Sequence, residues 1–197
     1  VEEQNPFLGL RGIRLSLARP EIFRVQLRAL CRAAFGRNLK VMLPMVTIPG
    51  ELAAAAALLD SAVAELAAEG IPAARPPLGI MVEVPAVAIL PQEFSAAAFF
   101  SIGSNDLTQY VTAAARDSAH VADLNDVANP AVMQLIANVA AYGARTGLEV
   151  SLCGDAGGSP THIPALLQAG LRSLSVAPAA IGQVKAAIAE FRLEPAR

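Results

Sequence analysis

The sequence predicts an α/β fold built on a parallel sheet, and two features of its patterning carry that prediction. Short and nearly continuous apolar runs, typical of strands covered on both faces, alternate with longer segments whose apolar residues recur at helical spacing. The 197 residues are 54% hydrophobic but only 5% aromatic, so we expect aliphatic side chains to build the core. Strand and helix in repeated alternation are typical of a parallel sheet with helices packed outside it.

The first expected elements lie in the N-terminal half of the chain. Apolar residues at helical spacing predict a helix over 20–34, and the run LKVMLPMV predicts a strand over 39–46. A second helix over 51–69 ends where Gly70 stands, and the run LGIMVEV predicts a strand over 78–84.

The later elements continue the alternation. A weaker helix follows Pro85. Asn129 and Pro130 supply an N-cap and a proline at the first helical position, and the helix they begin ends near Gly147. The remaining expected elements are strands over 98–104, 149–155 and 173–178, a short helix over 163–169 and a last helix from 181 to about 191.

Five strands are too few to close a (β/α)₈ barrel, which typically takes about 250 residues. The pattern by itself therefore leaves two architectures open: an open doubly wound sheet, or part of a barrel whose first strands are missing. In both, functional groups gather at the carboxyl ends of the strands. No long linker or low-complexity tract interrupts the chain, so we expect residues 1–197 to form one domain.

Composition and charge exclude several classes of protein. The chain has 15 Lys and Arg against 17 Asp and Glu, a net charge of −2, whereas nucleic-acid binding driven by counterion release needs a basic face. Polar residues interrupt the uncharged stretch over 127–144, so we expect no membrane insertion. Two cysteines and no export signal favour the cytoplasm. The chain begins at Val1, so we expect it to be a fragment of a larger protein.

Two carboxylates stand where neighbouring predicted strands end. Glu83 lies in MVEVPA without a polar neighbour, and Asp106 closes the sequence GSND. A carboxylate at the end of a buried strand is costly unless it is paired or coordinates a cation. The alternatives are an ion pair for Glu83 and a helix-capping turn for the GSND segment. Two carboxylates that leave positions open for water and substrate suit Mg²⁺.

Cationic and sulfur-containing side chains complete the set of candidates. Arg11, Arg28 and Arg116 carry guanidinium forks that match phosphate and carboxylate, although a solvated surface arginine is the alternative for each. Cys153 lies at a predicted strand end beside Gly154 and Asp155, where it is either a buried apolar residue or part of a site.

The motifs together resemble a known family. NPFLGLRGIR, QLRAL, LPM, GIMVEVPA, FFSIGSNDLTQY, SLCGD and SLSVAP occur in the order seen in the phosphoenolpyruvate-utilising enzymes, and they cover essentially the whole chain. The sequence looks most like the C-terminal phosphoenolpyruvate-binding domain of enzyme I of the phosphoenolpyruvate:sugar phosphotransferase system. The resemblance implies a parallel (β/α) barrel of the TIM type, present here as an incomplete C-terminal portion with about five strands.

The resemblance also implies a role for each candidate residue. Glu83 and Asp106 match the Mg²⁺ ligands of the family, and Cys153 matches the residue that protonates the enolate carbon. The residues that match substrate-binding positions are Arg11, Arg28, Asn105, Arg116 and Lys40, the last of which replaces an arginine of the family. Lysine offers a point charge without a bidentate fork, so we expect weaker phosphate binding at that position.

The activity implied by the resemblance is transfer of the phosphoryl group from phosphoenolpyruvate to a histidine on a separate upstream domain, with release of pyruvate. A phosphocarrier protein as partner and a homodimer follow from the same resemblance. The upstream strands and the histidine domain are not found in this chain, so we expect the fragment to be inactive alone. Two alternatives remain: the equivalent domain of pyruvate phosphate dikinase or phosphoenolpyruvate synthase, and a degenerate, non-catalytic regulatory module, which Lys40 and Asp155 motivate because they depart from the family pattern.

Overall fold

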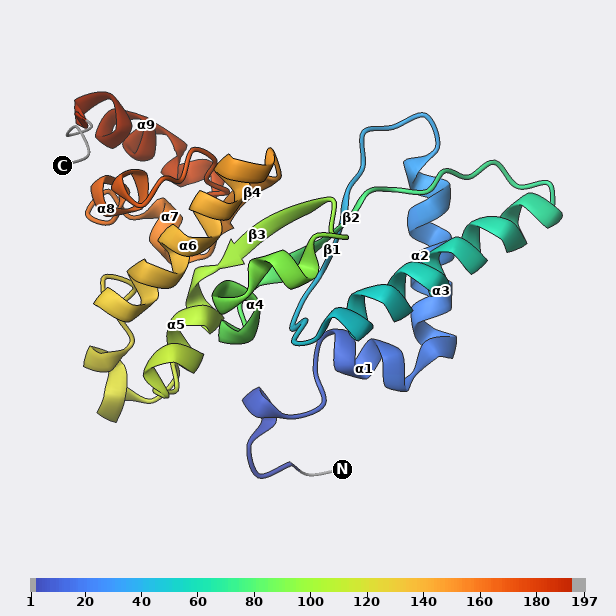
Figure 1. Cartoon of the computed structure of the whole chain (residues 1–197), viewed down its shortest axis with the longest axis horizontal. Coiled ribbons are helices and arrows are strands. Elements are labelled where there is room, and N and C mark those ends of the chain that lie inside the picture. Colours follow the sequence, from blue (N-terminus) through green and yellow to red (C-terminus); the bar gives the residue numbers. More distant parts are fainter. Residues whose placement is uncertain (1–2, 193–197) are drawn as a thin grey trace.

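The computed structural model describes residues 3–192, which form a four-stranded parallel sheet packed against helices (Figure 1). The strands are β1 (Val41–Leu43), β2 (Leu78–Val82), β3 (Phe99–Gly103) and β4 (Glu149–Cys153), and they lie side by side in chain order. Because every pair is parallel, all carboxyl ends meet at one edge of the sheet. The predicted parallel α/β architecture is confirmed.

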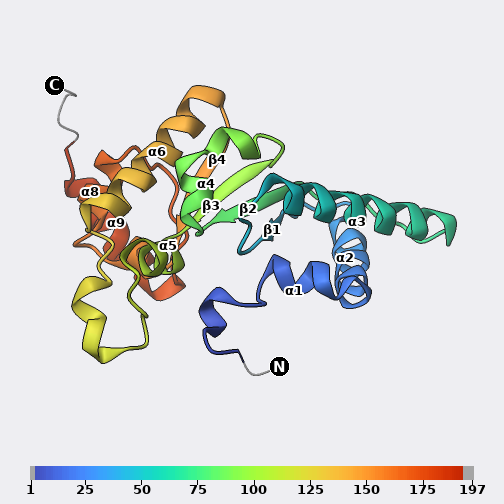
Figure 2. The same ribbon diagram turned by 60° about the horizontal axis from the view of Figure 1, so that its bottom comes forward.

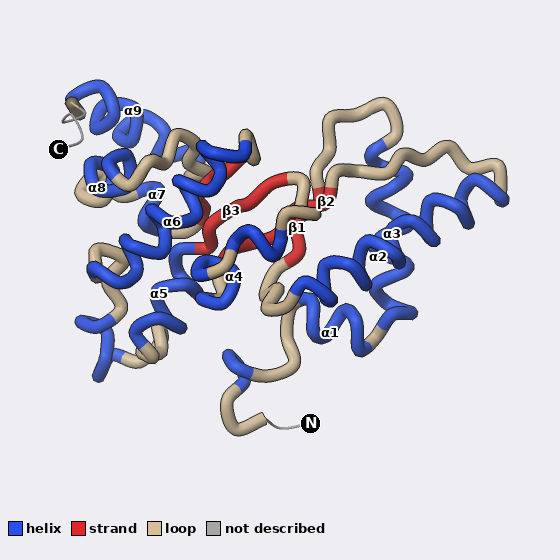
Figure 3. Tube along the Cα trace, in the orientation of Figure 1, coloured by secondary structure: helices blue, strands red, loops and turns tan. Residues whose placement is uncertain are grey.

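Helices make up most of the remaining chain, as the tube representation shows (Figure 3). Seen from a second direction, α2 and α3 lie together at one end of the sheet, whereas α6, α8 and α9 gather at the other (Figure 2). The α-helices are α1 (Ile13–Ala18), α2 (Pro20–Ala34), α3 (Pro49–Ala68), α4 (Pro85–Ile89), α5 (Ser104–Thr112), α6 (Pro130–Thr146), α7 (Asp155–Gly158), α8 (Ile163–Gln168) and α9 (Ile181–Glu190). Short 3₁₀ turns lie at Pro6–Leu8, Pro91–Phe94, Ala119–Leu124 and Pro178–Ala180.

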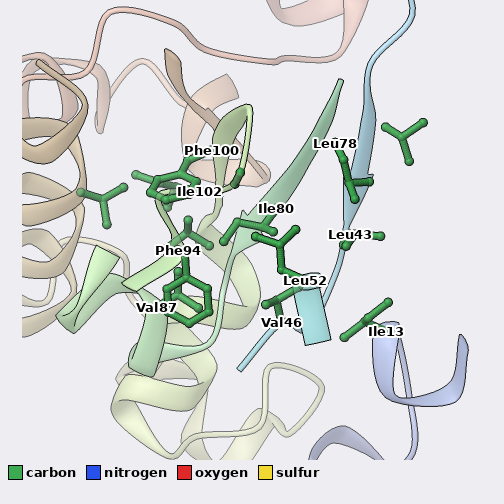
Figure 4. Packing of buried hydrophobic residues seen from close by; sticks show 14 of the residues in the cluster. Ile13, Leu43, Val46, Leu52, Leu78, Ile80, Val87, Phe94, Phe100 and Ile102 are labelled. Carbon is green, nitrogen blue, oxygen red and sulfur yellow. The ribbon is translucent and has the colours of Figure 1, made fainter. Parts of the chain in front are cut away.

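One face of the sheet forms the main core. Leu43, Ile80 and Ile102 occupy alternate positions of neighbouring strands and are at most 2% exposed, and they pack with Leu52 of α3 and Val87 of α4 (Figure 4). Aliphatic and phenyl side chains of this size each contribute about 1.5–3 kcal/mol when fully buried. The core therefore holds the strands in place and fixes the position of their carboxyl ends.

The second face of the sheet is less apolar and carries the opposite alternate residues. Met42 pairs with Gly79 across β1 and β2, and Ser101 pairs with Ser151 across β3 and β4. A Cβ atom at Gly79 would lie 2.6 Å from ring carbons of Phe99, so glycine makes room for that ring. Lys40 and Glu149 lie at the end of the sheet where the strands begin, and Glu83 lies at the end where they finish.

Local sequence signals set several element boundaries as predicted. The helix α2 spans the predicted residues 20–34. At the start of α6 the Asn129 side chain accepts a hydrogen bond from the Ala131 N–H (2.9 Å), and Gly147 ends this helix in the left-handed conformation, with φ of 76°. The first strand is shorter than predicted, because Pro44 has no N–H to continue the ladder and Met45 adopts a φ of 61°.

The predicted fifth strand over 173–178 is wrong. The segment forms a single bridge, in which Leu152 pairs with Leu174. Two backbone hydrogen bonds make this bridge: the Leu152 N–H donates to the Ser173 carbonyl (3.0 Å), and the Ser175 N–H donates to the Leu152 carbonyl (2.8 Å). Pro178 has no N–H and begins a 3₁₀ turn, so the chain leaves the sheet before a ladder forms.

Candidate functional site

Two buried carboxylates meet at the carboxyl edge of the sheet. Glu83 directly follows β2 and is 4% exposed, and Asp106 lies in the first turn of α5, directly after β3, and is 6% exposed. Burial raises the pKa of Glu83 to about 7, and the nearby negative charge of Asp106 acts in the same direction. The structure therefore brings the two predicted metal ligands together.

Backbone geometry fixes the Glu83 carboxylate. The Met45 N–H, presented by the turn after β1, donates a hydrogen bond of 2.6 Å to Glu83 Oε1. On the neighbouring strand Gly103 leaves the space that the carboxylate needs, since a Cβ atom there would lie 3.0 Å from Glu83 Oε2. The turn after β1 thus holds the carboxylate, and β3 leaves room for it.

Two arginines converge on Asp106 from distant parts of the chain. Arg11 donates a hydrogen bond of 3.2 Å from Nη2 to Asp106 Oδ2. Arg116 places Nη1 3.3 Å from Asp106 Oδ1 without the orientation of a hydrogen bond. Among the described residues, nothing donates a hydrogen bond to this buried Oδ1 atom. An oxygen in that state has lone pairs free for a cation.

An aromatic pair links the two arginines. The Phe7 ring centroid lies 5.6 Å from the Arg11 guanidinium carbon and 5.9 Å from that of Arg116. The Tyr110 hydroxyl accepts a hydrogen bond from Arg11 Nη1 (3.2 Å) and donates one to the Phe7 carbonyl (2.5 Å). Burial raises the pKa of Tyr110, which keeps its hydroxyl protonated as a donor.

Asn105 is held by a reciprocal pair of hydrogen bonds. Its Nδ2 donates to Asp155 Oδ2 (3.0 Å), and its Oδ1 accepts from the Asp155 N–H (3.1 Å). Gly154 makes this approach possible, because it has a φ of 102° and a Cβ atom there would lie 2.8 Å from Asn105 Oδ1. Asp155 therefore orients the neighbouring asparagine.

Cys153 is the last residue of β4 and pairs with Gly103 at the same edge. Its carbonyl accepts a hydrogen bond from Ser104 Oγ (2.9 Å), and its side chain is half-buried. A pocket of about 410 Å³ lies beside these residues, and Asn105 and Arg116 are part of its lining. The carboxyl edge thus combines a thiol, an amide, two buried carboxylates, the exposed carboxylate of Asp155 and two guanidiniums.

Arg28 and Lys40 do not join this group, which corrects their predicted place in the substrate site. Arg28 of α2 donates hydrogen bonds to Glu65 (3.1 Å) and Glu69 (2.6 Å) of α3, so its guanidinium is used in a helix-helix contact. Lys40 precedes β1 and lies where the strands begin, at the end of the sheet opposite to the carboxyl ends. Its Nζ lies 2.5 Å from Glu149 Oε2. Carboxylates hold both cations away from the carboxyl ends of the strands.

The residues at the carboxyl edge fit a divalent cation. Burial is the main cause of the raised pKa of Glu83, and the neighbouring charge of Asp106 adds to it, so a hard cation would stabilise the charged carboxylates. No group of three or more potential metal-ligating side chains (His, Cys, Asp or Glu) occurs within residues 3–192. A pair of carboxylates is the ligand number typical of Mg²⁺, which retains water and binds substrate oxygens.

Sequence reasoning missed Phe7, Tyr110 and Asp155 as members of the site. All three lie inside motifs that the resemblance used, but their contacts join segments that are far apart in the chain.

In the part of the chain that the structure describes, no helix is long and apolar enough to cross a membrane.

Comparisons with known proteins agree with the motifs. The family model described as "PEP-utilising enzyme, PEP-binding domain" matches residues 1–193. The phosphoenolpyruvate-protein phosphotransferase of Haloferax volcanii is 43% identical over 201 residues, covering 100% of this chain and 36% of that protein. The protein of the same name from Staphylococcus carnosus is 46% identical over 182 residues, covering 91% and 32%. The chain thus spans about a third of the length of these curated relatives.

A solved structure supports the fold. A citrate lyase from Burkholderia xenovorans LB400 superposes with a TM-score of 0.61 at 20% sequence identity, over 83% of this chain and 53% of that chain. At this level of identity the likeness extends to the arrangement of strands and helices and not to the chemistry.

Proposed function

This chain belongs to the phosphoenolpyruvate-utilising enzymes, whose phosphoenolpyruvate-binding domain it carries, and on that basis we propose that it binds phosphoenolpyruvate with Mg²⁺. In the whole protein, the bound phosphoryl group would pass to a histidine on a separate domain. The single observation that carries the proposal is the meeting of two buried carboxylates and two guanidiniums at the carboxyl edge of the sheet.

Each residue at this edge has a definable task in the proposed complex. Glu83 and Asp106 would hold Mg²⁺, through Asp106 Oδ1 among other oxygens. When bound, Mg²⁺ supplies positive charge that stabilises the negative charge developing on the substrate oxygens. Arg11 and Arg116 would bind the phosphate by their N–H groups, and the amide of Asn105, already oriented by Asp155, would position the substrate.

The proposed reaction has two steps. In the first, a histidine nitrogen forms a bond to phosphorus while the bond from phosphorus to the enol oxygen breaks, and the enolate of pyruvate leaves. Charge stabilisation and positioning dominate such a transfer, which suits a site made of guanidiniums and fixed carboxylates. In the second step Cys153 gives the proton of its thiol to the methylene carbon of the enolate, and pyruvate results.

We further infer that the four strands belong to a larger (β/α) barrel of the TIM type. The strands are parallel and ordered as in the chain, and β1 lies at an edge of the sheet in the described residues. An unpaired parallel edge needs covering, and strands from elsewhere in the full-length protein would supply the partner. A phosphocarrier protein as the next acceptor, a homodimer and a cytoplasmic site of action are parts of the same proposal.

The position of Lys40 weakens the case for a degenerate binding module. Lys40 and Asp155 motivated that alternative, but Lys40 lies with Glu149 at the amino ends of the strands, and Asp155 accepts a hydrogen bond from Asn105. The names of the compared relatives favour phosphoenolpyruvate-protein phosphotransfer over a dikinase reaction.

Isothermal titration calorimetry on the full-length protein tests the proposal. Wild type should bind phosphoenolpyruvate only with Mg²⁺ present, and Glu83→Gln or Asp106→Asn should weaken binding at least about a hundredfold, because each removes a charged ligand. Glu149→Gln is the matched control, since it removes a carboxylate from the opposite edge. Binding that ignores both Mg²⁺ and the first two substitutions would disprove the site.

A further inference from the structure

The Phe7 ring contacts both guanidiniums of the proposed phosphate site. Arg11 and Arg116 are separated by more than a hundred positions in the sequence, yet their guanidinium carbons lie 5.6 and 5.9 Å from the same ring centroid. Both distances fall within the range in which a cation is attracted to an aromatic face. Asp106 also contacts both arginines.

Phe7 and Asp106 both contact the two arginines, but they differ in whether they leave the guanidinium N–H donors free. A carboxylate binds a guanidinium through its N–H donors, the same groups that an incoming phosphate must use. An aromatic face attracts the guanidinium through its π surface, so the N–H donors stay available. Asp106 is also a proposed metal ligand, and a bound cation would share the charge that now attracts the arginines. Phe7 can keep the two like charges close together in that state.

The backbone around Phe7 is anchored by polar groups. The Phe7 carbonyl accepts the hydrogen bond from Tyr110, and the Leu8 carbonyl accepts one from Arg14 Nη1 (3.0 Å). Arg14 also donates from Nη2 to Thr47 Oγ1 (3.1 Å), which ties the segment to the turn after β1. Leu8 itself is 63% exposed, so burial of its side chain does not hold the segment. These polar contacts fix the ring beside the arginines.

We propose that Phe7 is a positioning residue that holds Arg11 and Arg116 in place for the phosphate of the substrate. Phe7 belongs to the short 3₁₀ turn Pro6–Leu8, which is drawn near the N-terminus in Figure 1. This inference rests on the proposed function, because it concerns how the same site recognises phosphate. It adds a residue that contacts the two cations without competing for their donors.

The test compares two ligands on the full-length protein. Phosphoenolpyruvate carries a phosphate, whereas oxalate carries only carboxylates that a bound Mg²⁺ can accept. By calorimetry with Mg²⁺, Phe7→Leu should weaken phosphoenolpyruvate binding between about threefold and tenfold, because leucine fills volume without an aromatic face. Oxalate binding should change less than about twofold. A general loss of structure would weaken the binding of both ligands to the same extent.

A rescue variant and a control complete the experiment. Phe7→Tyr keeps the aromatic face and should restore phosphoenolpyruvate affinity to within about twofold of wild type. Phe35→Leu, the same substitution at a ring exposed at the end of α2, should change neither ligand. Equal phosphoenolpyruvate affinity in Phe7→Leu and wild type, or equal losses for both ligands, would overturn this inference alone. Failure of wild type to bind either ligand would instead overturn the proposed function.

Discussion

Charged residues lie at both ends of the sheet, where the strands begin and where they end, but their surroundings differ. At the amino end, Lys40 and Glu149 form an ion pair whose side chains are 40% and 58% exposed, so water solvates both partners. At the carboxyl end, Glu83 and Asp106 are buried, and one carboxylate oxygen has no hydrogen bond among the residues described. Residue type is similar at both ends, but the solvation of the charges is not.

The difference separates a surface ion pair from a site prepared for a ligand. Exposed ion pairs contribute about 0–1 kcal/mol, because water and salt screen them. Buried carboxylates cost free energy until a charged partner compensates them. The pKa of Glu83 stays raised by burial although the charge of Arg11 acts to lower it, so Arg11 does not fully compensate the buried Glu83 carboxylate. The carboxyl ends of the strands therefore carry an arrangement of charges that a cation would stabilise.

Substitution of Cys153 should give the largest effect at the carboxyl end. Cys153→Ser should leave phosphoenolpyruvate affinity within about twofold but slow proton exchange at the pyruvate methyl group at least about a hundredfold, because a hydroxyl is a poorer proton donor. Exchange into deuterated pyruvate can be followed by NMR on the full-length protein. Cys31→Ala, at the fully buried cysteine of α2, is the control and should alter stability instead. Unchanged exchange in Cys153→Ser would remove the thiol from the reaction.

A pair of glycines sharpens the comparison sterically. Gly154 and Gly70 both have positive φ values, of 102° and 70°, but only at Gly154 would an added Cβ atom meet other atoms, with Ser104 Oγ nearest and Asn105 Oδ1 2.8 Å away. Gly154→Ala should displace the asparagine and weaken phosphoenolpyruvate binding about tenfold or more. Gly70→Ala has open space and should cost only about 1 kcal/mol of backbone strain. Equal phosphoenolpyruvate affinities in the two variants, measured by calorimetry, would contradict this account.

Removal of the Glu83 charge should stabilise the metal-free protein. The pKa of about 7 in the folded state lies above the ordinary 4.5, so the folded form retains a proton that the unfolded form loses as pH rises through this window. Glu83 therefore destabilises the fold increasingly from about pH 4.5 to pH 7. Relative to wild type in EDTA, Glu83→Gln should gain about 2 kcal/mol between pH 5 and pH 8.

Thermal unfolding of the full-length protein at the two pH values checks this gain. Glu149→Gln, which removes a carboxylate from the exposed pair, should not share it. A Glu83→Gln midpoint that stays level with wild type at both pH values would mean that Glu83 is not destabilised by its surroundings.

The smallest effect is expected at the amino end. Lys40→Gln should lower the free energy of unfolding by less than about 1 kcal/mol, with a smaller loss at high salt, because both partners are exposed. Phosphoenolpyruvate affinity should stay within about twofold of wild type. A tenfold loss of affinity in this variant would return Lys40 to the substrate site and erase the distinction between the two ends.

Local chemistry explains which elements the sequence could predict. The N-cap at Asn129 and the left-handed Gly147 mark the ends of α6 without help from distant residues. The segment after Gly170 looked like a strand because its apolar residues suit one, but a strand also needs a partner along its whole length. That requirement depends on tertiary contacts, which the pattern of one segment does not contain.

The same division holds at the candidate site. Glu83, Asp106 and Arg11 are brought together as predicted, because strand ends in a parallel sheet share one edge. Lys40 was misplaced because the family match was followed, although Lys40 stands near the start of the predicted strand over 39–46 and therefore at its amino end. The role of Phe7 was missed because its contacts with Tyr110 and Arg116 span about a hundred residues of chain.

Direct binding of a paramagnetic cation tests the central claim that the two carboxylates hold a metal ion. Mn²⁺ can replace Mg²⁺ at oxygen-rich sites, and the loss of its free signal in electron paramagnetic resonance counts the bound ions. With oxalate present, the full-length wild type and Glu149→Gln should each bind one Mn²⁺ per chain. Glu83→Gln and Asp106→Asn should bind it at least about a hundredfold more weakly. Wild-type affinity for Mn²⁺ in the latter two variants would contradict the account.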